Sequence, residues 1–341
     1  MSPYRRKRIW IIFSCLALWF FDLPLAFGQS EHTARLIEGA KKESRLVWYT
    51  SFNVSDVKIL VDAFKKKYPF VQAESFRASG EKTLNRILTE TRAGRWEFDA
   101  VSLTQIGTLV QHKVLSLYIS PEVKAYIPEF KDPAGYWAGA ASNYYTVTYN
   151  TKLVSEKEAP KRWEDLLHPK WKGKISIDRE EYPWYAALLE AWGKEKTQGF
   201  MEALARQDIQ WRKDHALIAQ LMAAGEFPLS IGYAHRIEDM KKKGAPVEWV
   251  HTVDPIVAGI IRLAMSAKPN NPSATKLFID FILSKEGQET IQAQGRVAAR
   301  SDVEPFSPQM AQSKLKLKAV PQDFELRHND HAQAFKRIFG L

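Results

Sequence analysis

The chain has 341 residues, a formal net charge of +10 and a single cysteine, Cys15. A chain of this length can form two lobes of ordinary domain size, and a composition with 45% apolar residues and 11 tryptophans is typical of a globular protein rather than a disordered one. Its only thiol lies close to the N-terminus, so the rest of the chain has no disulfide, thiol nucleophile or cysteine metal ligand. The moderate positive charge comes without a stripe of alternating arginines and aromatic residues, which argues against nucleic acid as a partner.

The N-terminal residues have the pattern of an export signal. A basic cluster, Arg5 to Arg8, precedes an apolar run from Ile9 to Phe21, and Ala26-Phe27-Gly28 offers a cleavage point. The apolar run would span roughly 20 Å as a helix, which is less than the ~30 Å hydrocarbon core of a membrane. We therefore expect residues 1–28 to be a signal peptide and the mature protein to lie in the periplasm, with an uncleaved anchor as the alternative.

The first part of the mature chain alternates between strand and helix patterns. Short apolar runs predict three strands, and apolar residues at helical spacing after the first two predict helices between them. Three strands connected by helices in this way imply a right-handed parallel sheet whose polar loops gather at the carboxyl ends of the strands, where ligands bind in sheets of this kind. The predicted strands are 46–49, 71–76 and 98–103, and the predicted helices are 57–64 and 79–94.

A second lobe follows an extended crossing. Residues 137–150 mix Tyr and Val with Thr and Asn, which favours a long strand, and residues 256–267 form a second extended run that returns the chain. We assign residues 29–140 and 258–341 to the first lobe and 141–257 to the second, joined at a hinge. Between the crossings we expect strands at 174–177 and 228–231 and helices at 183–192, 198–206 and 215–224, and after them helices at 271–282 and 285–294.

Four stretches of the chain resemble, in order, the extracellular solute-binding proteins of bacterial ABC importers. The resemblance is to the branch that contains ferric-iron, thiamine, phosphonate and sugar-phosphate binders. It implies a type 2 periplasmic-binding fold, in which two α/β lobes close on a small solute, and delivery of that solute by a monomer to a permease in the inner membrane. It implies no cofactor, a metal ion being present only as transported ligand. The stretches are 45–50 (RLVWYT), 162–174 (RWEDLLHPKWKGK), 223–228 (AAGEFP) and 274–287.

Polar residues follow each predicted strand of the first lobe. Hydroxyl, amide and backbone N–H groups at one edge of a parallel sheet can converge on a ligand. Each of these residues also has an ordinary explanation as a helix cap or a strand end, so the prediction depends on their convergence. The candidate ligand-binding residues of this lobe are Thr50, Ser51, Asn53, Ser79, Gly80 and Thr104.

Two clusters follow strands of the second lobe. Arg179 can form a forked contact with a carboxylate or phosphate, although pairing with a neighbouring acid explains it equally well. The ring of Tyr182 can stack on a ligand or pack into the lobe. Because donors outnumber acceptors across the two lobes, we expect an anionic or phosphate-bearing solute. The candidate residues of this lobe are Asp178, Arg179, Tyr182, Tyr233, His235 and Arg236.

A ferric-iron specialisation of the same fold is the first alternative. Iron binders of this family usually carry adjacent tyrosines at the turn where Tyr233 is followed here by Ala234, and many have a histidine in the first loop, which Thr50-Ser51-Phe52-Asn53 lacks. We assign Tyr144-Tyr145 to the crossing strand and do not expect it to replace that pair. Tyr233 and His235 can still bind a hard cation together with an anion.

A secreted hydrolase is the alternative from another class. The sequence contains no G-x-S-x-G, no H-E-x-x-H and no P-loop spacing, and its eight histidines are scattered. No residue is therefore assigned a catalytic role, and the chain is expected not to be an enzyme.

Overall fold

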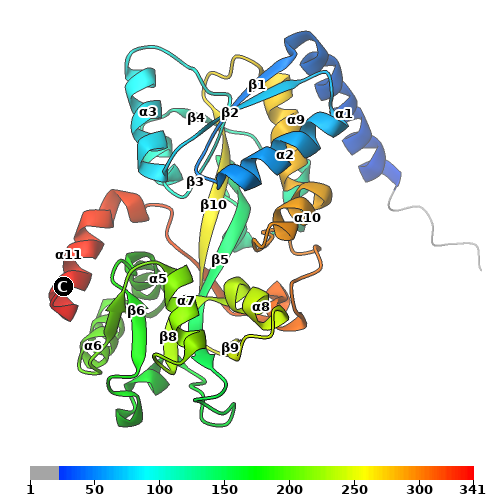
Figure 1. Cartoon of the computed structure of the whole chain (residues 1–341). Coiled ribbons are helices and arrows are strands. Elements are labelled where there is room, and N and C mark those ends of the chain that lie inside the picture. The colour runs from blue at the N-terminus through cyan, green and yellow to red at the C-terminus, as the bar shows by residue number, and fades with distance from the viewer. Residues whose placement is uncertain (1–22) are drawn as a thin grey trace, which may run out of the picture.

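A computed structural model describes residues 23–341 (Figure 1). The basic cluster and the whole apolar run of the predicted signal peptide lie outside the described residues. The first described element is helix α1 (Leu23–Glu43), which the sequence analysis did not predict and which begins inside the expected signal. No helix in residues 23–341 is both long and apolar enough to span a membrane.

The first lobe contains the three predicted parallel strands. They lie in the order β2-β1-β3, with β1 (Arg45–Thr50) in the centre, as expected for consecutive strand-helix units. Helix α3 begins after Ser79, whose side chain accepts a hydrogen bond from the backbone N–H of Lys82. The other elements are β2 (Gln72–Arg77), β3 (Ala100–Leu103), β4 (Leu115–Ser116), α2 (Val54–Lys67), α3 (Gly80–Arg92) and α4 (Ile106–Gln111).

Two long antiparallel strands join the lobes, and both were predicted. Strand β5 (Trp137–Asn150) and strand β10 (Ile256–Ser266) pair along most of their length, and Figure 1 shows them running from one lobe into the other. Strand β10 also pairs with β3 of the first lobe and β5 with β8 of the second, so a single sheet continues through the molecule in the order β2-β1-β3-β10-β5-β8-β6-β7. The lobes are therefore connected by strands rather than by a flexible linker.

The second lobe repeats the parallel arrangement. Strand β6 lies between β8 and β7, parallel to both, and helices flank this part of the sheet. The predicted helices are present within a few residues of their expected bounds, whereas β7, β9 and α8 were not predicted. The elements are β6 (Ile175–Asp178), β7 (Gln210–Arg212), β8 (Leu229–Tyr233), β9 (Val247–Trp249), α5 (Tyr182–Trp192), α6 (Lys194–Ala205), α7 (His215–Ala224) and α8 (Ala234–Lys242).

The C-terminal part of the chain does not remain with the first lobe. Helices α9 (Pro272–Leu283) and α10 (Lys285–Ala293) pack there, but helix α11 (His328–Phe339) contacts α5 and α6 of the second lobe, and the Phe335 ring lies 5.5 Å from that of Tyr182. The assignment of residues 328–339 to the first lobe was therefore wrong; elsewhere the lobe boundaries stay predictions. The remaining elements are β11 (Leu317–Ala319) and the 3₁₀ helices Pro121–Ala125, Pro128–Phe130, Trp163–Leu167, Pro169–Trp171, Pro308–Met310, Gln312–Lys314 and Phe324–Arg327.

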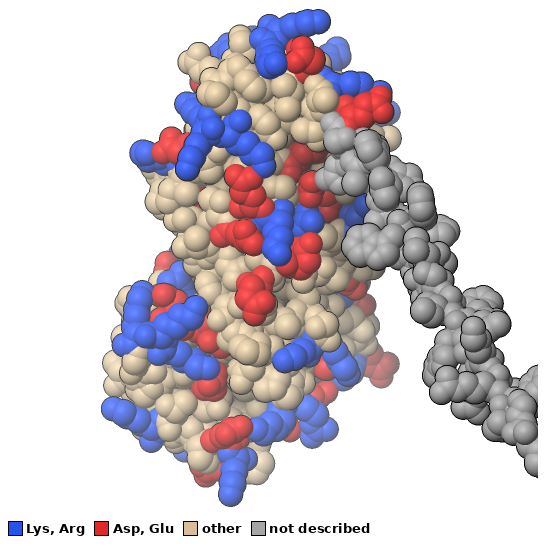
Figure 2. Space-filling model, turned by 90° about the vertical axis from the view of Figure 1, so that its right-hand side faces the viewer, with Lys and Arg blue, Asp and Glu red and all other residues tan. Residues whose placement is uncertain are grey.

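Charged side chains of both signs are interspersed on the face shown in Figure 2. Acidic and basic residues alternate over both lobes and between them, and no broad basic stripe crosses this face. Side chains of both charges are therefore mixed on this face, which is the pattern of a solvated surface rather than of a nucleic-acid interface.

Replacement of Asp214 tests the start of helix α7. Its carboxylate accepts hydrogen bonds from the N–H groups of Ala216 (2.6 Å) and Leu217 (3.2 Å), and its φ of 80° favours glycine. We expect Asp214→Ala to lower the free energy of unfolding by about 1–2 kcal/mol and Asp214→Gly by less, because glycine relieves the backbone strain. Urea unfolding measures both, and equal losses would show that backbone strain makes no difference at this position.

Candidate functional site

The three predicted loops of the first lobe lie together at one edge of the sheet. The N–H of Ser51 donates to the carbonyl of Ser102 at 3.1 Å, which holds the first loop beside the end of β3. Gly80 lies close to Gln105: a Cβ on Gly80 would come within 2.6 Å of the Gln105 side-chain oxygen. The same oxygen accepts a hydrogen bond from the Thr104 hydroxyl, so the second and third loops meet here. This convergence follows from the parallel order of the strands.

The individual residues of this edge differ in what they can offer a ligand. The hydroxyl of Thr50 is buried and accepts a hydrogen bond from the N–H of Phe52, so it shapes the turn. Asn53 is exposed and its side chain makes no cap to α2. Arg77, which the sequence analysis missed, ends β2 and donates to the carbonyl of Phe52 at 2.9 Å. Its place between a predicted strand and Ser79 was the signal that could have found it.

The first cluster of the second lobe is mainly structural. The Asp178 carboxylate is buried and accepts from the backbone N–H groups of Glu180 (2.9 Å) and Asp214 (2.8 Å), so it fixes two turns. Arg179 is exposed at the end of β6. Tyr182 is buried against α11, and it is not among the residues that line the cleft cavity described below.

Tyr145 and Tyr233 form a pair where the crossing strand meets the second lobe. Their hydroxyl oxygens lie 3.3 Å apart and are hydrogen-bonded, and their rings meet edge to face at 4.9 Å. Strand β5 runs antiparallel to β8 with Tyr145 directly opposite Tyr233, so the crossing strand brings a second phenol beside Tyr233. Whether this pair can replace the adjacent tyrosines of iron binders stays open. Directly opposed residues of antiparallel strands place their side chains on the same face.

Two histidines and a glutamate lie around this tyrosine pair. The ring centroids of His215 and His235 lie 4.1 and 5.5 Å from that of Tyr233, and His215 Nε2 lies 3.5 Å from a carboxylate oxygen of Glu181. Burial raises the pKa of Glu181 well above its usual range, and the Asp178 carboxylate raises it further. Burial lowers the pKa of His215 to about 4 and that of His235 to about 3. Both histidines are therefore neutral at pH 7, because for His215 the desolvation on burial outweighs the opposing effect of the Asp178 and Asp214 carboxylates.

Burial also raises the pKa of both phenols. The nearby Glu181 carboxylate acts in the same direction on Tyr145 and Tyr233, so each phenol stays protonated at neutral pH. His215 and Glu181 were not predicted as site residues, because the contacts of His215 with Tyr233 and with Glu181 depend on where helices α7 and α5 begin in the folded lobe. Arg236 is exposed in the first turn of α8.

A cavity of about 240 Å³ opens between the lobes at the crossing strands, and we call it the cleft cavity. Gly259 of β10 lines it and lets the Tyr145 ring pack closely against that strand, since a Cβ there would approach the ring to 3.1 Å. The buried guanidinium of Arg262 donates to the carbonyls of Thr104 (2.9 Å) and Val320 (2.6 Å), which ties the first lobe to the C-terminal segment. The lining residues are Thr104, Asn143, Tyr145, Pro183, Tyr233, Gly259, Ile260, Ile261, Arg262, Val320, Pro321 and Phe324.

The polar groups of the cleft cavity are suited to hydrogen bonding with a polar solute. Hydroxyl and amide groups and one arginine line it, and no described lining residue is a carboxylate. No group of three or more His, Cys, Asp or Glu side chains arranged to hold a metal ion occurs in residues 23–341. The paired phenols can bind a hard cation only after losing their protons, which burial opposes.

Comparison with known proteins identifies the family. The family model described as "Bacterial extracellular solute-binding protein" matches residues 60–319. The Fe(3+)-binding periplasmic protein of Serratia marcescens is 23% identical, with 81% of this chain and 82% of the relative covered.

Two solved structures share the fold. The periplasmic binding protein AfuA of Actinobacillus pleuropneumoniae, solved with exogenous fructose-6-phosphate bound, is 27% identical, with coverage of 87% of this chain and 96% of that one and a TM-score of 0.65. Iron-bound HitA of Pseudomonas aeruginosa is 18% identical, with coverage of 87% and 99% and a TM-score of 0.73. The two lobes joined by crossing strands and the similarity to these structures show that the fold is the type 2 periplasmic-binding fold. Because the family model matches most of the chain, the chain belongs to the bacterial extracellular solute-binding proteins.

Proposed function

We propose that the chain is the periplasmic receptor of an ABC importer, which captures a small anionic solute bearing a phosphate or carboxylate group and delivers it to the permease in the inner membrane. The observation that carries the proposal is the cleft cavity, where Thr104 of the first lobe faces Tyr145 and Tyr233 across the crossing strands. Hydroxyl and amide donors there can bind an anion without repulsion from a lining carboxylate, and the Arg262 guanidinium adds positive charge.

The first lobe adds further donors beside this cavity. Gly80, the first residue of α3, lies against Gln105, so the backbone N–H groups at the start of this helix are close to the loop of Thr104. Helix α3 has 13 residues, and its N-terminus carries partial positive charge. Arg77 is exposed at the same edge of the sheet. A solute seated between Thr104 and Tyr233 would thus meet donors from both lobes.

Closure on the solute provides the mechanism of capture. Strands β5 and β10 span both lobes, so the lobes can close about them. A solute that contacts both lobes stabilises the closed state by as much as its affinity for the closed state exceeds its affinity for the open state. One chain supplies both halves of the cavity, which supports function as a monomer. A bound solute should raise thermal stability by about 2.7 kcal/mol at one hundred times its dissociation constant.

Ferric iron, carried as cargo together with an anion, is the second candidate. It is favoured by the 3.3 Å contact between the Tyr145 and Tyr233 hydroxyls, since two phenolates on one side of a cleft can bind a hard trivalent cation. The iron-binding relative from Serratia marcescens supports it at 23% identity. The two candidates differ in the charge state of the phenols, which remain protonated with an anion and ionise with iron.

Calorimetric titration with fructose 6-phosphate and with ferric citrate tests the proposal. We expect the sugar phosphate to bind and Tyr233→Phe to weaken it about 10- to 100-fold, because a hydrogen bond to a charged group contributes roughly 1.5–3 kcal/mol. Tyr149→Phe on the same crossing strand is the matched control, since Tyr149 does not line the cleft cavity, and it should leave the affinity unchanged.

Three results would contradict the anion proposal. If ferric citrate binds tightly and gives a visible absorption band that both Tyr145→Phe and Tyr233→Phe abolish, iron is the cargo. If mass spectrometry of protein produced in the periplasm finds a neutral or cationic solute retained, the ligand class is wrong. Turnover of any candidate ligand by the purified protein would favour the secreted hydrolase.

A further inference from the structure

The C-terminal segment, residues 320–339, contacts both lobes beside the cleft cavity, and we call it the strap. Val320, Pro321 and Phe324 line the cleft cavity, and helix α11 then lies along α5 and α6 of the second lobe. Figure 1 shows α11, in red, beside the second lobe and the turn before it at the level between the lobes. The strap is therefore a connection between the lobes in addition to the crossing strands β5 and β10.

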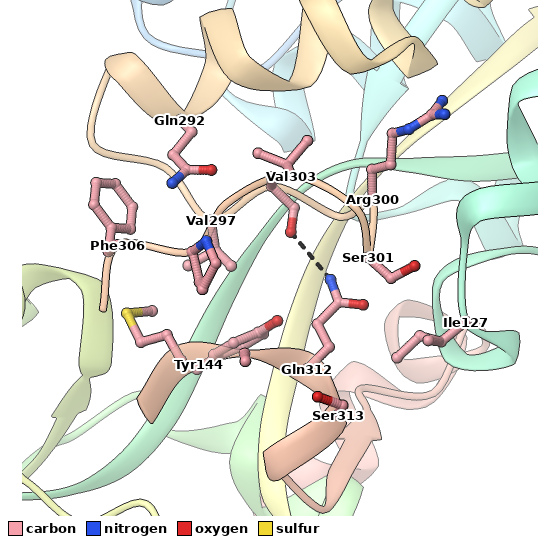
Figure 3. Close-up of a pocket in the computed structure, with 14 residues that line it drawn as sticks. Ile127, Tyr144, Gln292, Val297, Arg300, Ser301, Val303, Phe306, Gln312 and Ser313 are labelled. Atoms are coloured by element: carbon pink, nitrogen blue, oxygen red, sulfur yellow. Dashed lines mark hydrogen bonds between the residues drawn. The ribbon is translucent and has the colours of Figure 1, made fainter. Parts of the chain in front are cut away.

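The chain enters the strap from a fixed position at the crossing strands. Gln312 donates to the carbonyls of Ala298 (3.3 Å) and Ala299 (3.2 Å), in the wall of a cavity of about 190 Å³ behind β5 (Figure 3). Strand β11 then pairs with the start of β10, and the N–H of Val320 donates to the carbonyl of Ala258 at 2.9 Å. The strap thus starts from the sheet itself rather than from a loose loop.

The first lobe holds the strap through a close backbone contact and two hydrogen bonds. A Cβ on Gly107 of helix α4 would lie 2.0 Å from the carbonyl oxygen of Gln322, so the strap can approach this helix only at a glycine. The Gln322 side chain accepts a hydrogen bond from the Trp137 indole at 2.9 Å. The Arg262 guanidinium donates to the carbonyl of Val320 at 2.6 Å. Because Gln322 is exposed, water competes for its bond and this anchor is weak.

The second lobe holds the strap through a buried aromatic cluster. Phe335 of α11 has none of its surface exposed, and its ring centroid lies 5.5 Å from that of Tyr182 and 6.0 Å from that of Trp211. The Phe324 ring stacks on that of His331 of α11 at 5.7 Å, so it is held from this side as well. Burial of apolar surface is the dominant source of stability in a fold, so α11 is the stronger of the two anchors.

No linker separates the two anchors. The 3₁₀ helix Phe324–Arg327 lies against α4 of the first lobe and continues directly into α11. If the lobes move apart about the crossing strands, one anchor must therefore break, and the first-lobe anchor is the weaker. We propose that the strap is a latch across the cleft. Residues 321–327 dock on the first lobe when the lobes are closed and leave it when they open, while α11 stays on the second lobe.

A latch of this kind stabilises the closed state before any solute binds, so it is tested on the solute-free protein. Gly107→Ala places a methyl group against the backbone of the strap, whereas alanine favours the helix and leaves α4 intact. The matched control is Gly199→Ala in α6, where a Cβ would meet nothing within 4 Å. We expect Gly107→Ala to speed hydrogen exchange of residues 321–327 at least about tenfold, with α11 and the control protein exchanging as in the wild type.

Distances between spin labels on the two lobes measure the opening itself. Cys15, the only cysteine of the chain, lies in the predicted signal peptide, so labels at Lys82→Cys on α3 and Lys174→Cys before β6 are on the only thiols of the exported protein. Both positions are exposed. We expect Gly107→Ala to shift the label distances toward longer values and Gly199→Ala to leave them unchanged.

Gln322→Ala is a second variant that keeps the fold, because this side chain is exposed. Loss of its hydrogen bond to Trp137 should speed exchange of residues 321–327 about threefold and lengthen the label distances less than Gly107→Ala does. The proposal is overturned if both variants leave that exchange as in the wild type, if exchange rises without a change in label distance, or if α11 exchanges as fast as residues 321–327. Failure of fructose 6-phosphate to bind would contradict the proposed function and would leave these solute-free measurements as they are.

Discussion

Replacing Phe278 by alanine is expected to lower the free energy of unfolding by about 3–5 kcal/mol, the range for deletion of a buried phenylalanine ring. Phe278 of helix α9 has none of its surface exposed, and its ring centroid lies 5.2 Å from that of Trp48 on β1 and 5.1 Å from that of Phe64 on α2. These contacts join a strand and two helices that come from opposite ends of the chain. Deleting the ring leaves a cavity where all three elements meet.

Urea unfolding followed by tryptophan fluorescence and circular dichroism measures this loss. The matched control is Ile59→Ala on α2, because that side chain is 36% exposed and we expect a change of less than about 0.5 kcal/mol. If Phe278→Ala costs no more than the control, the α9 helix does not belong to the cooperative core of the first lobe.

Acidification from pH 7 to pH 4 is expected to destabilise the protein through its buried histidines. Burial lowers the pKa of His235 to about 3, with the cations Arg236 and Arg296 contributing to that shift. The unfolded chain takes up a proton near the ordinary histidine pKa of about 6.5, whereas the folded protein does not until the pH falls to about 3. The unfolded state therefore binds more protons throughout this window, and stability falls as the pH falls.

We expect the loss to be about 2 kcal/mol or more between pH 7 and pH 4 for His235. His215, whose pKa burial lowers to about 4, acts in the same direction. Glu181 acts in the opposite direction, because its raised pKa penalises the folded state at high pH and this penalty disappears as the carboxylate becomes protonated. The opposing contribution makes single-residue variants necessary.

His235→Gln should flatten the dependence of stability on pH between 7 and 4, measured by urea unfolding at each pH. The control is His112→Gln, since His112 is exposed at the C-terminal end of α4 and should leave the profile unchanged. An identical slope in the wild type and His235→Gln would contradict the conclusion that His235 is held neutral in the folded protein.

The sequence was informative wherever hydrophobic patterning determines structure locally. The apolar run at Leu46 to Tyr49, the helical spacing after Val57 and the extended run 137–150 each became the predicted element, and Ser79 caps the predicted helix. Patterning failed for α11, because an amphipathic segment shows that it has a buried face but not which lobe covers it.

The candidate site shows the same division. The convergence of the loops at Ser51, Gly80 and Thr104 was predictable, since consecutive strand-helix units place their strand ends at one edge of a parallel sheet. Whether those residues bind the solute stays a prediction. The loop of Arg77 lies at the same edge and could have been included by the same reasoning.

Export, the two-lobed α/β architecture and the solute-binding family were open to inference from the sequence, because each rests on local composition, periodicity or the order of motifs along the chain. Only the tertiary structure paired Tyr145 with Tyr233 and placed His215 and Glu181 beside them. The physical reason is register. Which residues of β5 and β8 stand opposite each other depends on packing across the whole sheet, and a shift by one residue would exchange the faces of Tyr144 and Tyr145.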